Sequence, residues 1–127
     1  MVGIVIVSHS EALANSIVEL TKMMADGACI AAAGGLEDGS FGTSYERIKQ
    51  AIERVYSLDG VIILMDMGSA VMTTEMVLEE YEDERIRMVD APIVEGAIVA
   101  TVDAVNGSSM DEMLEDLSGV RSTAKFG

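Results

Sequence analysis

Near its amino terminus the chain reads Gly3-Ile4-Val5-Ile6-Val7-Ser8-His9-Ser10-Glu11. The first five residues are apolar or small, which is typical of a buried strand, and the polar residues after them indicate a turn into a helix. His9, the single histidine of the 127 residues, lies in that turn. Ligands and reacting groups collect at this end of parallel strands, so His9 is a candidate nucleophile or general base. The alternative is that His9 merely begins the helix.

The same change from strand to helix patterning recurs along the chain. Further strands are predicted at residues 29–33, 61–65 and 85–89, and helices at residues 11–26, 43–55, 70–81, 93–105 and 109–117. Apolar strands separated by amphipathic helices indicate a parallel sheet covered on both faces. We therefore predict an α/β fold, an open doubly wound sheet forming one domain over residues 1–117. Residues 118–127 lack periodicity and are expected to fray.

In such a sheet the turns that follow the strands open on one edge. If the first and third strands are neighbours, with the second and fourth outside them, a crevice lies between His9 and Asp66. Asp66 could then accept a hydrogen bond from one ring nitrogen, which would fix the tautomer and leave the other nitrogen facing outward. Alternatively, Asp66 is a turn residue that helps to cap the next helix.

A histidine held in this way suits phosphoryl transfer, because a phosphorylated imidazole keeps one N–H that needs an acceptor. Gly68 and Ser69 begin a helix and would offer backbone N–H groups to a phosphate. The hydroxyls of Ser8, Ser10 and Ser69 could add to that seat. We predict Ser10, Gly68 and Ser69 as the phosphate-binding residues.

A glycine-rich loop follows the second predicted strand. Gly34, Gly35 and Gly39 could let the main chain approach the phosphoryl group or contact a partner, although turn geometry also explains them. Met67 could sit at the rim as an adaptable contact, whereas Met65, Met72 and Met76 are expected to fill the core. The chain has no nucleotide-binding motif, no second histidine and no cysteine cluster, so we expect neither a cofactor nor a metal.

Composition excludes several kinds of partner. A net charge of −14 argues against nucleic acid, whose phosphates attract clustered Lys and Arg. The longest apolar runs are too short to cross a bilayer. The lone Cys29 cannot form an internal disulfide, and we expect it to be buried and inert, which fits a reducing cytoplasm.

Four ordered segments carry a family resemblance: residues 4–10, 35–44, 65–70 and 91–97. They resemble the mannose-type IIA domains of the bacterial phosphotransferase system, and most closely the DhaM family of phosphoryl-donor subunits. The likeness spans residues 3 to about 105, and four motifs in order are far more specific than any one of them. It implies a strand order of 2-1-3-4 and a homodimer.

The resemblance also implies a role for each candidate residue. His9 matches the residue that accepts a phosphoryl group from the carrier protein HPr, and Asp66 matches the carboxylate that orients it. Phospho-His9 would then phosphorylate ADP held on the DhaL subunit, which acts with DhaK on dihydroxyacetone. A cytoplasmic phosphotransferase subunit is expected, without a membrane or nucleic-acid partner.

The chain departs from the family pattern in two respects. Some DhaM proteins carry fused HPr-like and enzyme-I-like domains, and 127 residues are too few for either, so we expect a separate donor protein. Sugar-transporting relatives usually have Gly-Gly-Ser-Pro after the aspartate, where this chain has Met67-Gly68-Ser69-Ala70. Two alternatives stay open: a IIA component of a mannose-type sugar transporter, and a regulatory binding module without enzymatic activity.

Overall fold

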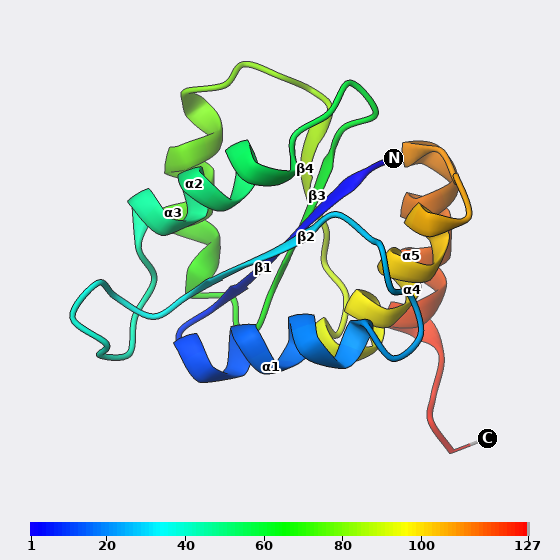
Figure 1. The fold of residues 1–127 in the computed structure, drawn as a ribbon, viewed down its shortest axis with the longest axis horizontal. Coiled ribbons are helices and arrows are strands. Elements are labelled where there is room, and N and C mark those ends of the chain that lie inside the picture. The colour runs from blue at the N-terminus through cyan, green and yellow to red at the C-terminus, as the bar shows by residue number, and fades with distance from the viewer. Residues whose placement is uncertain (127) are drawn as a thin grey trace.

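The computed structural model describes residues 1–126 and has a four-stranded parallel sheet between two layers of helices (Figure 1). The strands are β1 (Gly3–Ser8), β2 (Ile30–Gly34), β3 (Val61–Met65) and β4 (Ile86–Met88). The helices are α1 (Glu11–Thr21), α2 (Tyr45–Val55), α3 (Ala70–Glu79), α4 (Ile93–Val105) and α5 (Met110–Ser122). The strand order β2-β1-β3-β4 confirms the predicted doubly wound α/β fold. No helix in the described residues is both long and apolar enough to span a membrane.

Each face of the sheet has its own core. Val5, Val7 and Ile63 pack among side chains of α2 and α3 on one face. Ile4, Ile6 and Leu64 pack among side chains of α1, α4 and α5 on the other. Figure 1 shows these two groups of helices on opposite sides of the strands. Because successive side chains of a strand point to opposite faces, the central strands β1 and β3 are apolar along almost their whole length.

The register of the sheet brings the ends of β1 and β3 together. Val7 pairs with Met65, and the Asp66 backbone N–H donates to the Val7 carbonyl at 3.1 Å. On the other side of β1, Ser8 pairs with Gly34. The turns after β1, β2 and β3 therefore meet at one edge of the sheet, as the sequence predicts.

Helix α1 ends earlier than predicted, at Thr21 instead of residue 26. The backbone N–H groups of Lys22, Met23 and Met24 each donate to the carbonyl three residues earlier, so the chain tightens into successive short turns. The Thr21 hydroxyl also donates to the Val18 carbonyl at 2.7 Å. This competition from local hydrogen bonds is invisible in the spacing of apolar residues.

Helix α5 ends later than predicted, at Ser122 instead of Leu117. The half-buried Val120 continues the buried face formed by Met113 and Leu117, so the helical pattern persists past Gly119. The predicted helix end at Leu117 is thus wrong, whereas the fraying expected of residues 118–127 stays a prediction, and Gly127 lies outside the described residues. Helix α2 begins at Tyr45 instead of residue 43, because Ser44 is its cap, and the Thr43 hydroxyl lies 3.0 Å from the Thr73 hydroxyl.

Three side chains lie in surroundings other than those predicted. Cys29 is exposed, because it lies just outside β2 at the edge of the sheet. Met72 and Met76 are 75% and 56% exposed, so they do not fill the core. Apolar composition alone misassigned all three, since only their direction on the folded backbone decides burial.

Candidate functional site

His9 and Asp66 are in contact where β1 and β3 end. His9 Nδ1 lies 3.0 Å from Asp66 Oδ1, and the His9 backbone N–H donates to Asp66 Oδ2 at 3.0 Å. One carboxylate therefore holds residue 9 through both its ring and its main chain. The contact predicted between these distant residues is present in the structure.

The surroundings of Asp66 set the tautomer of the His9 ring. Burial alone would raise the pKa of Asp66, but hydrogen bonds from the backbone and ring of His9 and from the Ser8 hydroxyl outweigh it and lower the pKa below its ordinary value. At neutral pH the carboxylate is therefore ionised and can only accept hydrogen bonds. It follows that Nδ1 carries a proton and that Nε2 of the neutral ring keeps its lone pair.

Ser69 lies beside that lone pair. Its hydroxyl oxygen is 2.8 Å from His9 Nε2 and makes no capping hydrogen bond to α3. No hydrogen bond within residues 1–126 uses the backbone N–H of Gly68 or Ser69, and both residues are exposed. The amino end of α3, with the positive end of its dipole, therefore faces the same nitrogen.

Ser8 supports the carboxylate from beneath. It is fully buried, and its hydroxyl donates to Asp66 Oδ2 at 2.9 Å and accepts the Ser10 backbone N–H at 3.0 Å. The expectation that this hydroxyl contributes to a phosphate seat is wrong, because it points inward. The signal for its actual role is a polar residue at the buried end of a strand, which requires an internal partner.

Ser10 caps α1. Its side-chain oxygen accepts the Leu13 backbone N–H at 3.1 Å. The oxygen is thus already engaged by the helix, although the hydroxyl hydrogen can still be donated. Its predicted phosphate contact stays a prediction.

The glycine-rich loop is tied to the turn that holds His9. The Gly35 N–H donates to the Ser8 carbonyl at 3.1 Å, and the Gly42 N–H donates to the His9 carbonyl at 2.9 Å. A Cβ at Gly34 would lie 2.6 Å from the Ser10 carbonyl oxygen, so close packing against α1 requires glycine there. Gly39 is exposed, and a Cβ there would meet nothing within 4 Å. A partner contact by Gly35 or Gly39 stays a prediction.

In residues 1–126, no hydrogen bond or ion pair joins a basic side chain to the His9 ring. Arg47, in the first turn of α2, pairs with Glu11 and donates to the Gly34 carbonyl at 2.8 Å. The groups beside Nε2 are therefore the Ser69 hydroxyl and the start of α3, and a phosphate contact by Gly68 or Ser69 stays a prediction.

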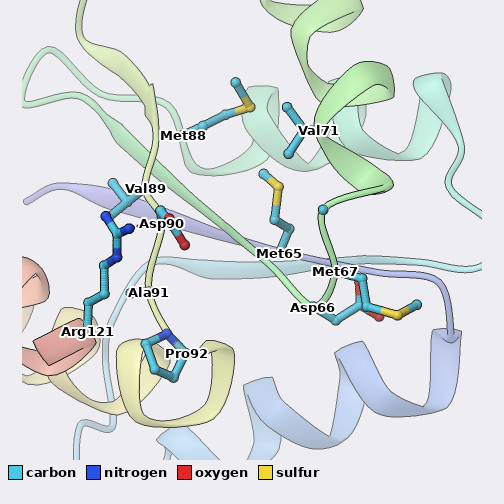
Figure 2. A pocket seen from close by; sticks show the side chains of 11 residues that line it. Met65, Asp66, Met67, Val71, Met88, Val89, Asp90, Ala91, Pro92 and Arg121 are labelled. Atoms are coloured by element: carbon cyan, nitrogen blue, oxygen red, sulfur yellow. Dashed lines mark ion pairs between the residues drawn. The ribbon is translucent and has the colours of Figure 1, made fainter. Parts of the chain in front are cut away.

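A pocket of about 590 Å³ adjoins the site between the ends of β3 and β4 (Figure 2). Asp66, Met67 and Gly68 line it on the side of the site, and Met65 and Met88 line its interior. Across the pocket, Arg121 pairs with Asp90 at 3.4 Å, and both side chains are largely exposed. Met67 is 55% exposed, and its role as an adaptable contact stays a prediction.

Comparison with known protein families agrees with this fold and site. A sequence model of the EIIA-man family, described as the PTS system fructose IIA component, matches residues 3–117. The match covers His9, Asp66 and Ser69 and all four strands. The chain therefore belongs to the EIIA-man family of the phosphotransferase system (PTS).

Curated relatives narrow this assignment to the DhaM proteins. The chain is 36% identical to the "PTS-dependent dihydroxyacetone kinase, phosphotransferase subunit DhaM" of Lactococcus lactis, with 91% of this chain and 92% of that protein covered. It is 33% identical to the "PEP-dependent dihydroxyacetone kinase 2, phosphoryl donor subunit DhaM" of Listeria innocua. That match covers 94% of this chain and 99% of that protein. Within the EIIA-man family the chain thus belongs to DhaM, which confirms the family resemblance of its sequence.

Other DhaM relatives are much longer. The chain is 40% identical to the "PEP-dependent dihydroxyacetone kinase, phosphoryl donor subunit DhaM" of Escherichia coli, and 91% of this chain is covered. The chain spans only 26% of the length of that relative.

Two solved structures share the fold. A crystal structure titled as the unknown function protein EF1359 superposes with a TM-score of 0.84 at 26% identity, and all of both chains is covered. A sigma-54 interaction domain protein from Enterococcus faecalis superposes with a TM-score of 0.73 at 18% identity, covering 92% of this chain and 87% of that one. The second likeness concerns the fold alone.

Proposed function

We propose that the protein is a phosphohistidine carrier that accepts a phosphoryl group from HPr on His9 Nε2 and passes it to ADP bound on DhaL. The observation that carries this proposal is the pair of contacts on the ring, with Nδ1 3.0 Å from Asp66 and Nε2 2.8 Å from Ser69. This arrangement keeps a proton on one nitrogen and presents the lone pair of the other next to a hydroxyl and the start of a helix.

In the accepting step, the Nε2 lone pair attacks the phosphorus of the donor's phosphohistidine. A bond from Nε2 to phosphorus forms as the donor's own bond from nitrogen to phosphorus breaks, and the electron pair of that bond stays with the donor ring. Because Nδ1 keeps its proton, the phosphorylated His9 ring becomes formally cationic. The ionised Asp66 stabilises that charge, while Ser10, Gly68 and Ser69 bind the phosphoryl oxygens.

In the discharging step, a terminal phosphate oxygen of ADP attacks the phosphorus and the bond to Nε2 breaks. ATP forms, and the electron pair returns to His9 as the lone pair of Nε2. The names of the DhaM relatives as donor subunits of a dihydroxyacetone kinase support DhaL and DhaK as the accepting complex. We place this reaction in the cytoplasm and take the working form as a homodimer, which light scattering of the purified protein tests.

The proposal is tested with phosphoenolpyruvate, enzyme I and HPr. Wild-type protein is expected to gain one acid-labile, alkali-stable phosphate per chain, and His9→Gln is expected to gain none. Because His9 is the single histidine of the sequence, no second imidazole can replace it. Wild-type protein that gains no phosphate would leave a regulatory module without enzymatic activity.

A second stage tests the acceptor. Adding DhaL loaded with ADP, together with DhaK and dihydroxyacetone, is expected to discharge the phosphate and form dihydroxyacetone phosphate. If phosphorylated protein keeps its phosphate in this mixture, the acceptor assignment is wrong. Discharge to a mannose-type sugar transporter instead would support the IIA transport component.

A further inference from the structure

Another pocket lies at an open edge of the sheet, and His9 is not among the residues that line it. β2 is the outermost strand, and no strand pairs with its outer side in residues 1–126. Helices α1 and α2 cover opposite faces of the sheet on either side of that edge (Figure 1). Between them is a pocket of about 270 Å³ with mainly polar side chains in its wall, which we call the β2-edge pocket.

The polar residues of the β2-edge pocket come from one face of each helix. Arg47, Gln50 and Arg54 are three and four residues apart on α2, so their side chains share a face. Glu11 and Asn15 are four residues apart and line the pocket from α1. Two of the eight basic residues of the chain thus lie at a single small pocket.

The charges of the β2-edge pocket leave one guanidinium available. Arg47 pairs with Glu11 and also donates to the Gly34 carbonyl at 2.8 Å. Arg54 is exposed and takes part in no ion pair in the part of the chain that the structure describes. Two arginines and one glutamate give the pocket a net positive charge, in a chain whose net charge is −14. A planar guanidinium binds a carboxylate or a phosphate through two parallel hydrogen bonds.

The main chain of β2 adds hydrogen-bonding groups to the pocket. The Ile4 N–H donates to the Cys29 carbonyl at 2.9 Å, and the Gly35 N–H donates to the Ser8 carbonyl at 3.1 Å. Odd-numbered residues of this segment therefore direct their main-chain groups toward β1. Ala32 has the opposite direction, so its N–H and C=O face the open edge, where it lines the pocket.

These features suit a small molecule better than an added strand. The Arg47 side chain already holds the Gly34 carbonyl, and a charged side chain over an edge group blocks the pairing of another strand. The volume is below the range of about 300–1,000 Å³ that is typical of pockets for drug-sized ligands. An oxyanion would bind Arg54, and hydroxyl groups beside it would meet amides that both donate and accept hydrogen bonds.

We propose that the β2-edge pocket binds a small hydroxylated metabolite with one phosphate or carboxylate group, whose oxyanion contacts Arg54 and whose hydroxyls contact Asn15 and Gln50. Phosphate and carboxylate share the geometry that a guanidinium recognises, so the experiment has to distinguish them. This binding site goes beyond the proposed function and does not depend on phosphoryl transfer at His9.

The test is a titration of isotopically labelled protein at low salt, followed by NMR. The probes are glycerol 3-phosphate, glycerate and glycerol, which share a hydroxylated carbon skeleton and carry a phosphate, a carboxylate and no charge. At least one anion is expected to shift the resonances of Ala32 and of the Asn15 and Arg54 side chains, and to bind about 10-fold or more tightly than glycerol. The tighter of the two anions identifies the oxyanion that the pocket prefers.

Variants of Arg54 test the role of its guanidinium. Arg54→Gln is expected to weaken binding of the preferred anion about 10-fold or more, which is the effect of losing a charged hydrogen bond. Arg54→Lys keeps the charge but not the planar fork, so it should weaken binding less. Arg87→Gln removes an exposed arginine from β4, at the opposite edge of the sheet, and should bind within about twofold of wild type. Far-UV circular dichroism checks that each variant is folded.

The proposal is overturned if neither anion binds, or if Arg54→Gln binds the anion as tightly as wild type. It is also overturned if the shifts centre on Gly68 and Ser69, because the anion would then occupy the start of α3. His9→Gln is expected to bind the anion as wild type does. Failure of this inference therefore leaves the proposed function intact, and failure of His9 phosphorylation by HPr leaves this inference intact.

Discussion

Helices α1 and α3 both begin beside His9, and each has a serine at its N-cap position. The Ser10 oxygen accepts the Leu13 backbone N–H at 3.1 Å and caps α1. The Ser69 hydroxyl makes no cap and lies 2.8 Å from His9 Nε2. The same residue type therefore stabilises one helix and faces the reactive ring from the other.

Backbone geometry explains this difference. Ser10 has extended torsions, with φ −117° and ψ 124°, which let its side chain reach back over the first turn of α1. Ser69 is already helical, with φ −65° and ψ −18°, so its side chain points away from the N–H groups of α3. The amino end of α1 is closed by its own residue, while that of α3 stays available to an anion.

The largest expected effect comes from Asp66, which joins the two helix starts through His9. Asp66→Asn is expected to slow phosphoryl transfer about 100-fold or more while the fold stays intact, because the ring loses the anion that orients it and offsets its charge. Rapid-quench measurement of His9 phosphorylation by HPr checks this. Transfer at the wild-type rate would show that Asp66 has no such role.

The two serines provide the direct test of the comparison. Ser69→Ala is expected to slow transfer about 10-fold, the effect of one hydrogen bond to a charged group, with little change in the free energy of unfolding. Ser10→Ala is expected to lower the free energy of unfolding by about 1 kcal/mol through loss of the cap, with a smaller effect on transfer. Urea denaturation and transfer rates of both variants, measured side by side, would refute the comparison if the two effects were exchanged.

Ser8 links the cap of α1 to the Asp66 carboxylate through two hydrogen bonds. Ser8→Ala removes the hydrogen bonds to Asp66 and from the Ser10 N–H, so we expect a loss of about 1–3 kcal/mol in the free energy of unfolding and transfer about threefold slower. Ser8→Thr keeps a hydroxyl and is the matched control. If Ser8→Ala transfers the phosphoryl group as fast as wild type, the hydrogen bond from Ser8 to Asp66 does not contribute to transfer.

The smallest expected effect is on the pH dependence of stability. The pKa of Asp66 is lowered in the fold, so its ionised form contributes stability above its ordinary pKa of 3.8, and this contribution is lost as the pH falls below that value. The difference in free energy of unfolding between wild type and Asp66→Asn should therefore shrink between pH 5 and pH 3. Urea denaturation across that range measures it, and a constant difference would contradict the prediction.

Asp103 is a control, because its pKa is raised and its effect on stability therefore changes with pH in the opposite direction to that of Asp66. Burial, followed by the neighbouring Asp116, raises the pKa of Asp103 to about 6, and one of its oxygens is buried without a partner in the described residues. Its contribution to stability is present at low pH and lost as the pH rises through about 6. Asp103→Asn should therefore become stabilising relative to wild type as the pH rises from 4 to 7.

Much of this architecture could be predicted from the pattern of residues. Strand β3 and helix α4 begin and end where predicted. A continuous apolar run defines the strand, and clear boundary residues define the helix of small residues, so the pattern fits few other assignments of secondary structure. Helix α5 begins close to its predicted start at residue 109, where Ser109 and Glu112 form a capping box. The ends of α1 and α5 could not be predicted, because short-range turns in one and packing of Val120 in the other override the pattern.

Apolar periodicity alone determined the parallel sheet, its two covered faces and the edge that holds the turns with His9 and Asp66, because strand and helix periods dictate which face of each element is buried. Tertiary structure decided which hydroxyl serves which partner. It turned Ser8 inward to Asp66, Ser10 to its own helix and Ser69 to Nε2, and it left Met72 and Met76 outside. Those outcomes depend on side-chain directions in three dimensions, which residue identity and spacing do not specify.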